Sequence, residues 1–361
     1  MSTSLTPEIE ESVNLQVDRN YFGNWEDVEI TLSLDAASSA TFTAPFAVEN
    51  ARFRDTFRPF KFQELEIDTH LETLFKGYVL PVEPDADTNF TRVAVSAYAK
   101  PAVLGDCSLP PKHPTTGAPV PREFKKLGLL AIAQACCDPF GIEVELLADE
   151  GKVFDKVRCG PEKKVHEFLC ELTKQRSLVM GSSTEGKLLL LQSADTGNPV
   201  ARFRQGELPA PAVKALFSPQ EYFSQITGYA SKKRGKAPAQ WTEQNPWLQA
   251  PFRPHTFKLE DTERADAPEA TKAKMARMFG NIVTYTIPDI PTWRDPKGKL
   301  WKPNTTITAH YPNSMIYEET ELLIRTVKLK TNREATTATL EVCLPGAFNG
   351  KMPERLPWIQ S

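Results

Sequence analysis

Alternating apolar and polar residues in the N-terminal part of this chain constrain its fold more than any other feature. A period of two is typical of strands that bury one face against a core. Turn-forming residues separate the alternating runs, as at residues 18–24, and no helical pattern interrupts them. We therefore expect an antiparallel barrel or sandwich over residues 12 to about 109. The runs cover residues 13–17, 28–34, 63–67, 74–82 and 91–98.

A different pattern begins after the proline-rich segment 109–121, which cannot continue a sheet. Apolar residues then recur at helical spacing in two places, and strands at 178–180 and 187–192 predict a hairpin. Residues 120–200 thus predict a small α+β unit. The first helical stripe consists of Leu129, Ile132, Ala133, Cys136 and Cys137, and the second of Val165, Phe168, Leu169 and Leu172.

Strand-like runs return in the C-terminal part of the chain, at residues 221–231, 305–309, 321–329 and 336–344. A long segment with one helix separates the first of these runs from the others. Asp266 can cap that helix, Pro268 lies in its first turn, and Gly280 is expected to end it. We interpret residues 232–297 as an insertion into a second barrel.

The segment 298–304 stands directly before the predicted strand 305–309. It combines a glycine turn, a buried-type Leu-Trp pair and a Pro-Asn stop, which indicates a structural element of a barrel rather than an active site. In the first barrel, the runs 77–79 and 106–108 hold comparable positions. The residues that we expect to act as structural anchors are Gly77, Tyr78, Asp106, Gly298, Leu300, Trp301, Pro303 and Asn304.

Two segments imitate ligand-binding motifs. Residues 181–187 have most of the spacing of a phosphate-binding loop, but Leu188 cannot place a hydroxyl on magnesium, and a strand rather than a helix is expected to follow. His166 and Cys170 have the i, i+4 spacing of a helical zinc site, but a third ligand is missing. We therefore predict no metal and no cofactor.

The other charged residues and the cysteines also predict no catalytic, nucleic-acid-binding or metal site. The alternate carboxylates Glu64, Glu66, Asp68 and Glu72 are typical of the solvated face of a strand. The basic run 232–236 lies in a loop without interleaved aromatic residues, so it favours solvation over contact with nucleic acid. The six cysteines form no CxxC motif and are expected to be reduced and mostly buried. No catalytic constellation is expected, so the chain is predicted not to be an enzyme.

Composition narrows the possible partners. A formal net charge of -3 argues against nucleic acid or an anionic membrane as the main partner. No stretch approaches the roughly 20 apolar residues that a spanning helix needs, so membrane insertion is not expected. Residues 1–11 lack the pattern of a signal peptide, which predicts synthesis in the cytoplasm.

The order of these motifs resembles that of the baseplate central hub proteins of contractile-tailed, Mu-like bacteriophages, a family of hubs with two tail-tube-like barrels. The matching segments include 77–79, 106–108, 223–226, 298–304 and 339–348. One departure is that residues 97–99 are Ala-Tyr-Ala where the family usually has Gly-Arg-Ser, so any role of that arginine does not transfer.

The resemblance implies a mainly β fold with α+β parts, in which two tail-tube-like antiparallel barrels accompany a smaller α+β domain and a helix-bearing insertion. It places the first barrel at residues 1–110, the α+β domain at 111–205, the second barrel at 206–231 and 298–350, the insertion at 232–297, and a C-terminal tail at 351–361.

The resemblance also implies a function: a structural hub of the tail baseplate in the virion, assembled in the host cytoplasm. Such a hub is a homotrimer that joins a sixfold tail tube to a threefold spike and contacts other baseplate proteins. Viral DNA passes through its channel during genome ejection without specific binding. Two alternatives stay open, namely the hub of a long non-contractile tail and a tail-associated cell-wall-binding or hydrolase protein.

Overall fold

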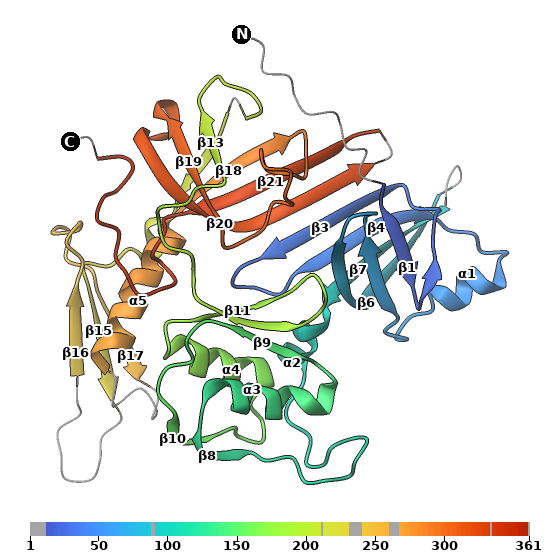
Figure 1. Cartoon of the computed structure of the whole chain (residues 1–361), viewed down its shortest axis with the longest axis horizontal. Coiled ribbons are helices and arrows are strands. Elements are labelled where there is room, and N and C mark those ends of the chain that lie inside the picture. Colours follow the sequence, from blue (N-terminus) through green and yellow to red (C-terminus); the bar gives the residue numbers. More distant parts are fainter. Residues whose placement is uncertain are drawn as a thin grey trace.

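The computed structural model describes residues 12–87, 91–210, 212–230, 240–259, 267–332 and 334–359. Over these residues the chain is mainly β, with helices between and beside the sheets (Figure 1). The predicted fold class, mainly β with α+β parts, is confirmed.

The N-terminal unit consists of antiparallel strands in the order β3-β4-β7-β6-β5-β1-β2. Strict alternation in the sequence explains them, since every second residue of β3 is buried and the others are only half-buried. Its elements are β1 (Asn14–Val17), β2 (Asn20–Tyr21), β3 (Asp27–Ser33), β4 (Ser39–Pro45), α1 (Ala51–Thr56), β5 (Glu64–Asp68), β6 (Thr73–Ala86) and β7 (Thr91–Ala99).

The middle unit packs helices against short strands, as the two apolar stripes predicted. All nine residues of those stripes are buried, and they share one core cluster. The predicted hairpin is also present as β11 and β12, and β9 pairs with β12 in parallel. The elements are η1 (Lys100–Ala102), α2 (Val103–Asp106), β8 (Glu123–Leu127), α3 (Leu129–Cys137), η2 (Asp138–Phe140), β9 (Val144–Leu147), β10 (Phe154–Arg158), α4 (Val165–Lys174), β11 (Val179–Ser182) and β12 (Leu188–Leu191).

The C-terminal unit contains strands of the large sheet and a small separate sheet that lies beside the helix α5 (Figure 1). The small sheet has the order β16-β15-β17. The elements are β13 (Ala201–Arg204), β14 (Lys214–Phe217), η3 (Pro219–Glu221), β15 (Gln225–Ala230), β16 (Gln240–Gln244), β17 (Pro254–Leu259), α5 (Ala267–Ile282), β18 (Val283–Ile290), β19 (Thr306–Tyr311), η4 (Pro312–Ser314), β20 (Ile316–Asn332) and β21 (Thr336–Cys343).

The long strand β20 joins the two β units into one sheet. Its first part pairs with β19, and its last part pairs with β3, from Thr326 opposite Ser33 to Asn332 opposite Asp27. Along its other edge it pairs with β21. In Figure 1 the red strands therefore continue directly into the blue ones. One hydrophobic cluster accordingly runs through both units and includes Ile30, Phe42, Trp301 and Leu329.

Strand partners correct the predicted layout of the C-terminal unit in three places. The run 221–231 does not enter the second barrel, because β15 pairs with β16 and β17. The end of the predicted insertion 232–297 is wrong, because β18 pairs with β14 and β21 in the large sheet. Similarly, β13 pairs with β19, although residues 201–204 were assigned to the α+β domain.

The predicted end of α5 at Gly280 is wrong, because the helix continues to Ile282. Gly280 instead allows a close contact, since a Cβ atom there would lie 2.9 Å from the Cβ of Ala347. The predicted cap, Asp266, lies outside the described residues. So does the basic run 232–236.

Candidate functional site

Gly77 and Tyr78 lie where β6 passes close to β7. A Cβ atom on Gly77 would lie 2.0 Å from the carbonyl oxygen of Tyr98, so the close approach of these strands requires glycine. Tyr78 is opposite Tyr98 in the strand register, and their rings pack edge to face with centroids 6.4 Å apart. The first two predicted anchors thus contact the same tyrosine.

Asp106 connects this tyrosine to the middle unit. Burial, together with the hydrogen bond to the Asp106 carboxylate, raises the pKa of Tyr98 to about 12, so the phenol remains a donor at neutral pH. Asp106 ends α2, and its carbonyl oxygen accepts a hydrogen bond from Lys164 Nζ at the start of α4. The structure therefore brings three predicted anchors, Gly77, Tyr78 and Asp106, to one contact between the first sheet and the α+β unit.

The remaining predicted anchors form a tight turn before β19. Gly298 has a φ of 77°, a left-handed conformation that favours glycine. Leu300 and Trp301 are buried, with 4% and 2% of their surface exposed. The Trp301 indole Nε1 donates a hydrogen bond to the Thr292 carbonyl at 3.2 Å, and its ring lies 6.0 Å from that of Phe203. Trp301 is thus held by polar and apolar contacts.

Pro303 and Asn304 complete the turn. Pro303 is half-buried, and Asn304 adopts a left-handed φ of 66°. The Asn304 side chain accepts a hydrogen bond from the Ala194 amide at 2.6 Å and donates one to the Gln192 carbonyl at 3.0 Å. Because both partners follow β12, this turn attaches the exit of the middle unit to the second β unit.

A cluster of charges also joins the two β units at this turn. Arg294, whose side chain is only 8% exposed, lies 3.1 Å from the Glu72 carboxylate, and Lys302 lies 3.4 Å from the same carboxylate. Glu72 stands between β5 and β6, so the ion pairs cross from one unit to the other.

The other predicted acidic residues also have partners rather than a shared acid-base geometry. Glu64 pairs with Lys100 at 2.9 Å, and Glu66 pairs with Lys76 at 3.0 Å. Burial raises the pKa of Asp68. These contacts favour a structural role for this strand face over an acid-base site.

Residues 181–187 cover the end of β11 and the turn of the β11–β12 hairpin, and the strand β12 rather than a helix follows them. The loop packs against the first sheet: Ser182 Oγ lies 3.0 Å from Ser38 Oγ, and Lys76 lies 3.1 Å from the Glu185 carboxylate. A phosphate-binding loop needs the N-terminus of a helix, so this context contradicts that function. The segment instead holds the middle unit against the first sheet.

His166 and Cys170 both line a cavity beside α4. Burial lowers the pKa of His166, which keeps the imidazole neutral at pH 7. Among the described residues, no three His, Cys, Asp or Glu side chains gather as a metal site would require. Each of the six cysteines is free, and four of them are buried.

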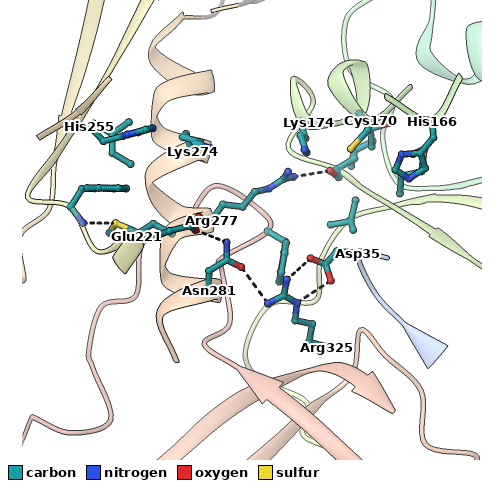
Figure 2. Close-up of a pocket in the computed structure, with 18 residues that line it drawn as sticks. Asp35, His166, Cys170, Lys174, Glu221, His255, Lys274, Arg277, Asn281 and Arg325 are labelled. Atoms are coloured by element: carbon teal, nitrogen blue, oxygen red, sulfur yellow. Dashed lines mark hydrogen bonds and ion pairs between the residues drawn. The ribbon is translucent and has the colours of Figure 1, made fainter. Parts of the chain in front are cut away.

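Arg325 connects three parts of the chain at this cavity (Figure 2). Its guanidinium donates to both carboxylate oxygens of Asp35, at 3.0 and 2.8 Å, and to the Gly280 carbonyl at 3.2 Å. The bidentate pair joins β20 to the turn after β3, while Gly280 belongs to α5. Sequence reasoning missed Arg325, although an arginine after three apolar residues was a usable signal.

Comparison with known proteins finds a family that the middle unit resembles. Residues 102–192 match the family model described as "Baseplate hub protein gp44-like, second domain". The chain resembles the baseplate hub proteins of phage tails. The resemblance predicted from the sequence is thereby confirmed. The match begins at α2, so it includes Asp106 and the hairpin that packs on the first sheet.

Solved structures extend the likeness of fold to the whole chain. The 43 kDa tail protein of prophage MuSo2 from Shewanella oneidensis has a TM-score of 0.77 and 24% identity, over 94% of this chain and 99% of that one. A tail protein from Neisseria meningitidis MC58 has the same TM-score at 17% identity and the same coverage. At identities this low, the TM-scores show a shared fold and no more.

A more distant neighbour is an Escherichia coli protein described as a component of the type VI secretion system with structural similarity to the T4 bacteriophage tail proteins gp27 and gp5. Its TM-score is 0.52 at 10% identity, over 96% of this chain and 78% of that one. A search of curated proteins found no match. Among the described residues, no helix is both long and apolar enough to cross a membrane.

Proposed function

We propose that the chain is a structural hub of a tail baseplate, in which three copies surround a central channel. The observation that carries this proposal is the pairing of β3 with β20, which joins two β units edge to edge in one chain. Three such chains present six β units around a threefold axis. The ring can then meet a sixfold tube on one face and a threefold spike on the other.

The contacts between the units support a rigid adaptor. The pairs Arg294–Glu72 and Arg325–Asp35 link the two β units, and Asn304 links the second of them to the middle unit. A hub that transmits force needs such cross-links, because separate domains joined by linkers would move independently. The proposed domain limits follow the strand partners, so β13 and β18 belong to the second β unit.

The proposed partners are the tail tube, the spike and other baseplate proteins, and the proposed place is the tail baseplate of the virion. The Escherichia coli neighbour supports a place in a tail, because its description relates it to the T4 tail proteins gp27 and gp5. Viral DNA is proposed to pass through the channel without specific binding, for which the net charge of -3 provides little attraction.

A structural adaptor needs no catalytic site to hold its partners together. The proposal therefore includes no enzymatic activity. The pure protein is expected not to hydrolyse peptidoglycan, nucleotides or peptides, with or without divalent metal. Clearing of cell-wall substrate by a preparation free of lysin, lost on substitution of one carboxylate, would instead support the hydrolase alternative.

Deletion of the gene tests the hub role directly. We expect particles without complete tails, visible by electron microscopy, and full tails when the wild-type gene is supplied from a plasmid. Normal infectious tails in the absence of the protein would contradict the proposal. A sheath gene beside the hub gene would support a contractile tail, and its absence would favour the long non-contractile one.

A further inference from the structure

A cavity of about 380 Å³ lies where the middle unit, α5, the small sheet and β20 meet (Figure 2). Ligand pockets for small molecules begin at roughly 300 Å³. The cavity is therefore large enough for a small organic molecule. Its walls come from elements that are distant in sequence, including α4, β15 and α5.

Arg277 supplies a positive charge to this cavity. It extends from α5 toward Lys174 and Cys170, and its Nη2 donates to the Leu178 carbonyl at 3.4 Å (Figure 2). Within the described part of the chain, no carboxylate lies within ion-pair distance of Arg277. A guanidinium carries five N–H donors and stays charged. Burial lowers the pKa of Arg277, so an anion beside it would relieve an unfavourable environment.

Arg325 has a carboxylate partner, which Arg277 lacks among the described residues. Arg325 lines the same cavity, and its charge is matched by both oxygens of Asp35. A bidentate carboxylate or phosphate is the usual partner of a buried arginine. Arg277 is half-buried, but no carboxylate that the structure describes forms an ion pair with it.

The charge of the described lining is positive as a whole. Four basic side chains, Arg277, Arg325, Lys174 and Lys274, face two acidic ones, Asp35 and Glu221. Asp35 is held by Arg325, and Glu221 accepts a hydrogen bond from Asn281 Nδ2 at 3.3 Å. Burial lowers the pKa of His166 and of His255, so neither adds charge at pH 7.

The cavity also has an apolar wall. The ring of Phe223 is stacked on that of His255, with centroids 4.6 Å apart, and Ile226 and Met278 lie beside it. We propose that the cavity binds a small organic anion, with its phosphate or carboxylate group on Arg277. Such a ligand would connect α5 to the middle unit. This inference goes beyond the hub role and does not depend on it.

Calorimetric titration of the full chain tests the proposal with phenyl phosphate and benzoate as probes. We expect saturable binding of one molecule per chain for at least one of them. Arg277→Gln should weaken binding by at least about tenfold, because it removes a charge-assisted contact. The matched control is Lys272→Gln, an exposed position of α5 outside the cavity lining, which should bind like the wild type.

Binding of phenyl phosphate alone would assign a phosphate ligand, and binding of benzoate alone would assign a carboxylate. Far-UV circular dichroism and melting without ligand verify that Arg277→Gln folds. If it does not fold, the double variant Lys174→Gln with Lys274→Gln provides the same test at the rim. Failure of both probes to saturate, or unchanged affinity in the folded cavity variant, would overturn the proposal.

Discussion

Trp301 is the predicted anchor with the clearest energetic consequence. Its ring is buried against Phe203, so Trp301→Ala should lower the free energy of unfolding by about 3–5 kcal/mol. Urea unfolding followed by circular dichroism measures this change. Trp241→Ala is the control, because that indole is 44% exposed and should cost much less. Equal stability of the two variants would show that Trp301 does not stabilise the core.

Asn304 combines a left-handed backbone with two side-chain hydrogen bonds. Asn304→Gly keeps the conformation but loses both bonds, whereas Asn304→Ala also strains the backbone. We expect Asn304→Ala to be the less stable variant, by about 1 kcal/mol relative to Asn304→Gly. Melting temperatures of the two variants measure the order. The reverse order would show that the φ of 66° is not what selects asparagine.

Cys343 predicts a pH dependence. Burial raises the pKa of its thiol to about 12 from 9.0, so the unfolded chain loses this proton at a lower pH than the folded one. Its contribution to stability is therefore complete below pH 9 and decreases as the pH rises toward 12.

The stability difference between wild type and Cys343→Ala should accordingly shrink by up to about 1.4 kcal/mol per pH unit above pH 9. Urea unfolding at pH 8, 9 and 10 measures it, and the comparison cancels the titration of other groups. A difference that stays constant over this range would show that the thiol already ionises in the folded state.

At the scale of elements, Gly77 determines how closely β6 approaches β7. Gly77→Ala would place a methyl group 2.0 Å from the Tyr98 carbonyl oxygen, a backbone atom, so the strands must separate. We expect a loss of about 2 kcal/mol or more in unfolding free energy. Gly105→Ala is the matched control, since a Cβ there meets nothing within 4 Å. Equal melting temperatures for both variants would contradict the close approach.

Local periodicity predicted the elements well but not all of their partners. The stripe of α4 and the hairpin β11–β12 depend on residues close in sequence, and the structure confirms both. The run that forms β15 was also recognised as a strand. Its parallel partner β17 could not be deduced, because the period of a strand does not specify which other strand it joins. The same reason explains why β18 was assigned to an insertion.

The site was predicted only in part for a related reason. Gly298 and Asn304 are visible in sequence because turns have local chemistry. Arg325 and Asp35 are 290 positions apart, and the sequence around each residue does not indicate that the other is its partner. Residues that act within a turn could thus be predicted, whereas the two partners of a long-range ion pair could not be matched to each other.

In the whole molecule, the two β units of one chain are proposed to build a ring from three chains. The pairing of β3 with β20 provides the double unit, and a threefold ring would use it as a sixfold rim. Light scattering coupled to size exclusion measures the mass of the full chain in solution, alone and mixed with the spike. We expect a hub mass close to three times 40.4 kDa. A mass of 40.4 kDa at every concentration, with and without the spike, would contradict it.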